Sequence, residues 1–411
     1  MPDYHLYTLP NGIRILHKQV THTKIAHCGF ILDIGSRDEN PDQQGLAHFW
    51  EHMAFKGTVK RKSFHILNRL ETVGGELNAY TTKEKLCFYA SLLESHFEKA
   101  FDLLTDITFH SIFPKKEIEK ERGVILEEMA MYLDTPEDAI MDEFDNVIFA
   151  NHSLGNNILG TKESVSSFTK ADFQAFIDQN LSTDSLVFCS VSNWPFEKVL
   201  KLAEKFLSEI PRIEKQRVRQ PFTTYQPAII NLEKPISQAH CVIGCPAYSL
   251  HDDRRISFFM LSNLLGGPGM NSRLNLAVRE KHGLVYTIDA NYATYIDTGL
   301  FGIYFGTEKK QLKRTTALVL KELKKLREKP LGTVQLHTTK EQLMGQLAMA
   351  EESNLGLMMM MGKSILDQNR VDSLNEIFDQ IRRIKATDLT DIANEILREE
   401  NLSILNYVPV K

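Results

Sequence analysis

Two histidines and a glutamate stand close together in the stretch LAHFWEHMAFKGT, from Leu46 to Thr58. If this stretch is helical, His48 and His52 lie one turn apart on the same face. Two imidazoles at that spacing can hold one Zn²⁺, with bonds of about 2.0–2.1 Å. Glu51 projects toward the same side and can reach a water at the metal without being a ligand. The pattern predicts a metal site with a general base; a helix face that happens to carry polar residues is the alternative.

A catalytic zinc site needs a third protein ligand and one open coordination position. The helical stretch ERGVILEEMAMYLDTPED contains the acidic candidates Glu121, Glu127 and Glu128. Its apolar residues indicate partial burial, and a buried carboxylate needs a partner, which a metal ion would provide.

The elements that must position these residues follow a regular order. The strand-like stretch KIAHCGFILDIG precedes the metal-site helix, which Asn40 can cap, Pro41 can open and Gly57 can end. A helix over SFHILNRLETVGG, the strands ELNAYTT and KLCFYASL, and helices over residues 94–111 and 114–133 follow.

The second half repeats this order. QAHCVIGCPAY is strand-like, RRISFFMLSNLLGG and MNSRLNLAVREKHG are helical, and two further strands precede a helix over residues 310–329. We therefore expect an α+β fold of two similar domains, each a mainly antiparallel sheet packed with helices, related as an internal duplication. The expected domains are 1–215 and 229–411, joined by a proline-punctuated linker at 216–228. The run LMMMMG should pack inside a C-terminal helix.

Composition excludes several classes of protein. The net charge of −5 gives no general attraction for nucleic acid. No run of about 18 apolar residues occurs, so no membrane span is expected. The five cysteines form no CxxC pair, which favours a reducing compartment, and with no signal peptide in view we expect a cytoplasmic protein.

Several of these stretches together resemble one family. HFWEHMAFKGT, GGELNAYTTKEKLCFYASL and ERGVILEEMAMYLDTPED resemble the pitrilysin and mitochondrial processing peptidase family of inverted zincins, which carry His-x-x-Glu-His. GMNSRLNLAVREKHGLVYTIDANYATYIDTGLFGIYFGT resembles the C-terminal domain of that family. The resemblance implies a zinc metalloendopeptidase with one Zn²⁺ per chain, which hydrolyses extended or unfolded peptides inside a chamber between domains.

The resemblance also assigns roles to residues. It makes Glu128 the third metal ligand beside His48 and His52, Glu51 the base that activates water, and Glu121 a supporting acid near the metal. Glu127 then occupies a position that need not be acidic.

Further roles concern the substrate. The resemblance implies that Arg279 and Tyr286, in REKHGLVY, assist catalysis and bind substrate, whereas an ion pair of Arg279 with Glu280 is the alternative. Asn78 and Ala79 are expected on a strand edge that takes up an extended peptide, the alternative being a plain hairpin strand.

The same resemblance also indicates which partners to expect. Inactive members of the family lose zinc-site residues, and this chain keeps them. We expect peptide substrates and a homodimer, or alternatively a heterodimer with a related subunit.

Overall fold

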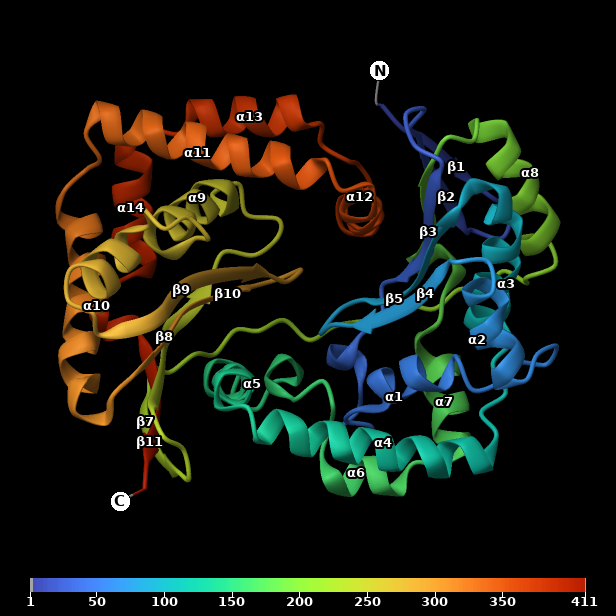
Figure 1. The fold of residues 1–411 in the computed structure, drawn as a ribbon, viewed down its shortest axis with the longest axis horizontal. Helices are drawn as coiled ribbons and strands as arrows, with labels where there is room; N and C mark the ends of the chain where they lie inside the picture. Colours follow the sequence, from blue (N-terminus) through green and yellow to red (C-terminus); the bar gives the residue numbers. More distant parts are fainter. Residues whose placement is uncertain (1–2, 411) are drawn as a thin grey trace. The chain divides into compact units, whose positions relative to one another are not determined.

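The computed structural model describes residues 3–410, which form two compact units (Figure 1). Unit 1 comprises the chain up to Met129, Asn156–Arg219 and Met349–Ser373. Unit 2 comprises Ala130–Gly155, Gln220–Ala348 and the chain from Leu374 onward. The units differ from the contiguous domains expected above, because each takes one helix-bearing segment from the other half of the sequence.

Unit 1 is built on a six-stranded sheet. Its strands are β1 (His5–Thr8), β2 (Arg14–Gln19), β3 (Ile25–Leu32), β4 (Glu76–Thr81), β5 (Leu86–Leu93) and β6 (Leu186–Ser192). Their order is β1-β2-β6-β3-β5-β4, and only β2 and β6 pair in parallel. The central strand β6 is buried along its whole length, whereas β4 lies at an edge.

Helices share an aromatic core with one face of this sheet. They are α1 (Leu46–Met53), α2 (Ser63–Glu71), α3 (Phe97–Phe109), α4 (Lys115–Leu133), α6 (Lys162–Ser167), α7 (Lys170–Asn180) and α8 (Phe196–Leu207). Phe188 of β6 lies at the centre of this core, with ring centroids 4.1 Å from Phe101 and 5.2 Å from Phe30. Alternation along the strands sends every second side chain into this core.

Helix α12 (Asn354–Gln368) covers the other face of the unit 1 sheet. Leu357, Met358 and Met361 pack against strand residues there, and the close approach requires Gly362, because a Cβ at that position would lie 2.3 Å from Cδ1 of Ile31. The expectation that LMMMMG packs inside a helix is confirmed.

Unit 2 repeats the strand order of unit 1. Its strands are β7 (Ile229–Lys234), β8 (Ala239–Ala247), β9 (Val285–Thr294), β10 (Gly299–Thr307) and β11 (Ser403–Pro409). Their order, β7-β11-β8-β10-β9, matches β2-β6-β3-β5-β4 strand for strand, including the parallel pair of first and last strands. The expected duplication is confirmed.

The helices of unit 2 also divide between the two faces of its sheet. They are α5 (Pro136–Ile148), α9 (Arg255–Gly266), the π-helix η5 (Asn275–Glu280), α10 (Leu312–Glu328), α11 (Thr333–Glu351), α13 (Leu374–Arg383) and α14 (Ala386–Ile396). Helix α5 packs Ile140 and Phe144 against Val242 and Leu405, as α12 does in unit 1. Short 3-10 helices occupy Ser36–Asp38, Glu94–His96, Ser153–Gly155, Thr183–Ser185, Lys309–Gln311 and Glu399–Asn401.

The start of helix α1 differs from the expectation. The helix begins at Leu46 and ends at Met53, so Asn40 is not its cap, Pro41 is not in its first turn and Gly57 does not end it. The buried carboxylate of Glu39 accepts hydrogen bonds from the backbone N–H groups of Gly45 (2.9 Å) and Ala47 (2.8 Å) and so replaces a local cap.

Within residues 3–410, no helix combines the length and the apolar character that crossing a lipid bilayer requires.

A buried network of ion pairs connects the end of the segment Asn156–Arg219 to the sheet of unit 1. The Asp33 carboxylate contacts Lys85 (2.8 Å), Arg217 (2.7 Å) and Arg219 (3.1 Å). Burial raises the pKa of Asp33, but Arg219, Lys85 and Arg217 lower it more, to about 2. Asp33 therefore stabilises the fold above its unfolded pKa, and this contribution disappears as the pH falls toward 2.

We expect Asp33→Asn to lower the free energy of unfolding by about 2 kcal/mol at pH 7, because the substitution removes the charge that the three cations stabilise. The deficit should be constant above about pH 5 and shrink as the pH falls toward 2. Urea unfolding followed by circular dichroism at pH 7, 5 and 3 measures it.

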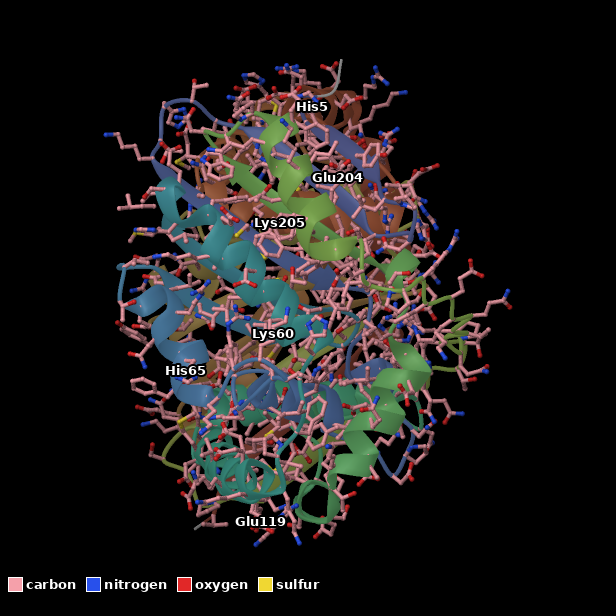
Figure 2. All side chains as sticks on the ribbon, turned by 90° about the vertical axis from the view of Figure 1, so that its right-hand side faces the viewer. His5, Lys60, His65, Glu119, Glu204 and Lys205 are labelled. Carbon is pink, nitrogen blue, oxygen red and sulfur yellow. The ribbon has the colours of Figure 1, made fainter. Side chains whose placement is uncertain are left out.

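The matched control is Glu98→Gln, which removes an exposed pair with Lys205 (2.6 Å; Lys205 is labelled in Figure 2) and should cost less than about 0.5 kcal/mol. A deficit for Asp33→Asn that is independent of pH, or no larger than that of the control, would contradict the role given to the network.

Candidate metal centre

Helix α1 places its two histidines side by side because its opposite side is buried. Phe49, Trp50 and Met53 are fully buried in the unit 1 core. His48 and His52, four residues apart, then share the remaining side, with ring centroids 4.6 Å apart. The helix thus presents two imidazoles to helix α4.

Helix α4 supplies the third group. Oε1 of Glu128 lies 3.8 Å from Nε2 of His48, and Oε2 of Glu128 lies 3.5 Å from Nε2 of His52. One ligand atom from each residue lies within 4.8 Å of the other two. Three ligands of a tetrahedral zinc ion stand about 3.4 Å apart, given bonds of about 2.0–2.1 Å. The observed spacing fits such an ion after small side-chain adjustments.

The neutral form of His48 is favoured. Burial, and then the neighbouring His52, lower the pKa of His48 to about 3. A neutral imidazole keeps the lone pair that a metal ion requires. Among residues 3–410, Nδ1 of His48 has no hydrogen-bond partner.

Glu121 orients His52. Nδ1 of His52 donates to Oε1 of Glu121 (3.0 Å), and Nζ of Lys56 pairs with Oε2 (2.7 Å). Burial raises the pKa of Glu121, but these contacts lower it more, so the net pKa lies below the ordinary value. The Glu121 carboxylate accepts a hydrogen bond from the Nδ1–H of His52, and this contact turns Nε2 of His52 toward Glu128.

Glu51 lies beside the cluster but outside the group of three. The hydroxyl of Thr81, on β4, donates to Oε2 of Glu51 (2.5 Å). Burial raises the pKa of Glu51, and only part of this rise is offset by Thr81 and His52. The side chain is thus fixed in orientation, with a raised affinity for a proton.

The strand-edge residues lie where the sequence predicted. Asn78 is exposed on the edge strand β4, and its Oδ1 accepts from the N–H of Ala79 (2.9 Å). Because β4 pairs with β5 alone within the described chain, its other edge has unpaired backbone groups.

Arg279 and Tyr286 come together within unit 2. The guanidinium carbon of Arg279 lies 5.8 Å from the ring centroid of Tyr286, which is 85% exposed. Both line a pocket of about 630 Å³ beside β9. Arg279 also approaches Glu280, with 3.6 Å between Nη1 and Oε1, as the alternative interpretation expected.

Sequence reasoning missed Lys56, Thr81 and Glu39. Lys56 could have been found, because the helix expected from the sequence extends to Gly57 and would place Lys56 one turn after His52; in the structure the helix already ends at Met53. Glu39 lies just before α1 but outside the usual cap position, and Thr81 reaches Glu51 from strand β4, so no standard pattern points to either.

Comparisons with known proteins identify the family of this chain. The sequence model described as "Insulinase (Peptidase family M16)" matches residues 14–162, and "Peptidase M16 inactive domain" matches residues 167–343. All metal-site candidates lie in the first matched region.

Relatives span nearly the whole chain. An uncharacterized zinc protease of Bacillus subtilis, YmxG, is 32% identical over 96% of both chains. An uncharacterized zinc protease of Rickettsia felis is 33% identical over 96% of this chain and 95% of its own.

Two solved structures share the fold. A protein from Pseudomonas fluorescens, described as a peptidase M16 inactive domain, superposes with a TM-score of 0.92 at 18% identity over 100% of this chain and 99% of its own. A protease from Helicobacter pylori gives 0.91 at 20% identity over the full length of both chains. The family match and the near-complete relatives place the chain in peptidase family M16, the pitrilysin-like metallopeptidases.

Proposed function

We propose that this protein is a zinc-dependent endopeptidase that hydrolyses extended or unfolded peptides. The observation that carries the proposal is the convergence of His48, His52 and Glu128, with Glu51 beside them and not among the ligands. The relatives named zinc proteases support zinc as the ion and peptide hydrolysis as the reaction. In this proposal the protein takes one Zn²⁺ per chain.

In the proposed reaction, the side chains of the site have separate roles. Zn²⁺ held by His48, His52 and Glu128 would supply a Lewis acid that polarises a peptide carbonyl and acidifies water. The Glu51 carboxylate accepts a proton from the attacking water and delivers it to the leaving amine. The hydroxyl of Thr81 keeps the carboxylate in place during both transfers.

The edge of β4 supports an extended substrate. A peptide that adds to this edge gains main-chain hydrogen bonds without needing a particular side-chain sequence. Asn78 and Ala79 are then the residues beside it. Most strands of a folded protein are already paired with neighbouring strands, so unfolded peptides are the preferred class.

Arg279 and Tyr286 complete the proposal. Their guanidinium and phenol are donors suited to an oxygen that gains negative charge as the carbonyl is attacked. The proposal includes a chamber formed with the second domain and a homodimer, as the family resemblance implies; a heterodimer is the alternative.

Glu51→Gln separates metal binding from catalysis. The variant should keep zinc close to one equivalent per chain, because Glu51 is not a ligand, while peptide cleavage falls at least about a thousandfold. Zinc content by mass spectrometry and cleavage of a fluorogenic peptide library measure the two effects. Glu127→Gln, an exposed neighbour of Glu128, is the control and should leave both unchanged. Cleavage retained in Glu51→Gln would rule out the assigned base.

His52→Ala should lose the metal. Zinc per chain should drop from about one equivalent to near zero after dialysis, because two ligands do not hold a catalytic ion. A chelator should abolish cleavage by the unaltered chain, and added Zn²⁺ should restore it. His65→Ala, exposed on α2 and labelled in Figure 2, is the control for a histidine outside the site. Full zinc retention in His52→Ala would refute the ligand set.

Tyr286→Phe tests the pair in unit 2. Removing the phenolic donor should lower kcat by about 10- to 100-fold with zinc content unchanged, because the lost hydrogen bond acts on the transition state. Steady-state kinetics with one peptide substrate give kcat and KM. Tyr7→Phe, on strand β1, is the control. A change in KM alone would indicate that Tyr286 only binds substrate.

A further inference from the structure

A lysine of helix α12 lies beside the edge strand β4 and has no role in the peptidase chemistry proposed above. Nζ of Lys363 lies 5.0 Å from the ring centroid of Tyr80. Tyr80 belongs to β4 itself, the strand whose free edge is proposed to take up the peptide. A positive charge therefore stands next to the proposed path of the substrate, within unit 1.

Contacts with α12 hold Tyr80 and the ammonium in place. The Tyr80 hydroxyl lies 3.7 Å from Sδ of Met359. Met359 and Lys363 are four residues apart and so share one side of the helix. Sγ of Cys87, the residue that pairs with Tyr80 across β4 and β5, also contacts Sδ of Met359 (3.6 Å). The position of Lys363 over the edge strand thus follows from the packing of α12 on the sheet.

The Lys363 ammonium lacks an acidic partner. Among the described residues, its side chain forms no ion pair and no hydrogen bond. Asp367, one turn further along α12, contacts Nζ of Lys85 instead (2.6 Å). Burial is the main cause of a lowered pKa of Lys363, and the surrounding charges do not restore it. A half-buried ammonium is ordinarily paired, so this position favours an anionic ligand.

Alternation along β4 indicates which part of a bound peptide would meet this ammonium. Leu77 and Ala79 pack into the core that contains α1, whereas Tyr80 packs on the face that α12 covers. A peptide paired with the free edge alternates in the same way, so its residue opposite Tyr80 points to the α12 face. Opposite residues have Cβ atoms about 4.5–5.5 Å apart, which lets an acidic side chain at that position reach the ammonium.

Given the proposed uptake of an extended peptide by β4, we propose that Lys363 selects an acidic side chain, Asp or Glu, at the peptide position opposite Tyr80. The carboxylate accepts a hydrogen bond from the ammonium, and opposite charge and partial burial strengthen this bond. Main-chain pairing gives affinity that is independent of sequence, and the contact with Lys363 adds a sequence preference. The preference opposes the net charge of the chain, −5, which by itself repels acidic peptides.

Peptide binding to the Glu51→Gln chain tests the proposal without cleavage of the peptide. Fluorescence anisotropy with a neutral dye compares uncharged peptides of about ten residues that differ only in one central residue: Glu, Gln or Lys. Blocked termini exclude binding through a terminal carboxylate. A peptide can slide along the edge, so the register that brings Glu opposite Tyr80 is selected. The Glu peptide should bind about fivefold tighter than the Gln peptide or more, the Lys peptide should bind most weakly, and added salt should reduce both differences.

Variants at Lys363 assign the preference to this residue. With Lys363→Gln added, the Glu and Gln peptides should bind within about twofold of each other, whereas Lys363→Arg should keep the preference for Glu. Lys60→Gln, at an exposed lysine labelled in Figure 2, removes the same charge elsewhere and should keep the full preference. Zinc content and circular dichroism check that each variant is folded. A preference that survives Lys363→Gln, or that is lost equally in Lys60→Gln, overturns the proposal.

Failure of this inference is distinguishable from failure of the proposed function. Equal binding of the three peptides, or no binding of any of them, refutes selection by Lys363. Cleavage of the uncharged Gln peptide by the unaltered, zinc-loaded chain is measured separately, and it decides whether the protein is a peptidase.

Discussion

The metal centre depends on the burial of one side of helix α1. The helix has eight residues, too few for stable helicity alone, so tertiary contacts must hold it. Phe49 and Trp50 anchor it in the core, and the carboxylate of Glu39 satisfies the N–H groups at its start. With that side fixed, His48 and His52 have one direction left, toward Glu128 of α4. The arrangement of the candidate ligands is thus a consequence of hydrophobic packing on the far side of the same helix.

Further polar contacts fix the orientation of His52 and of Glu51. Glu121 lies between His52 and Lys56, and its carboxylate accepts a hydrogen bond from the Nδ1–H of His52 while it pairs with Nζ of Lys56. Thr81 connects Glu51 to β4, the strand whose free edge is proposed to take the peptide. In the proposed mechanism, one hydrogen bond therefore connects the base to the strand that lies beside the peptide.

The sequence revealed those features that local periodicity encodes. The spacing of His48 and His52, the methionine-rich helix and the repeated order of elements all follow from patterns of one turn or one strand, and the structure contains each of them. Contacts outside these patterns were missed. The carboxylate of Glu39, and not the side chain of Asn40, accepts hydrogen bonds from the backbone N–H groups of Gly45 and Ala47 at the start of the helix. An amphipathic helix does not specify which sheet it covers, so the exchange of α5 and α12 between the units was also missed. Whether Arg279 and Tyr286 act in catalysis stays a prediction.

X-ray absorption spectroscopy of the zinc-loaded full-length chain tests the central claim most directly. The account predicts a first shell of nitrogen and oxygen atoms only, at about 2.0–2.1 Å, with multiple scattering from two imidazoles. The imidazole signal should fall in His52→Ala. Sulfur neighbours at about 2.3 Å, or a spectrum with the signal of a single imidazole, would contradict it.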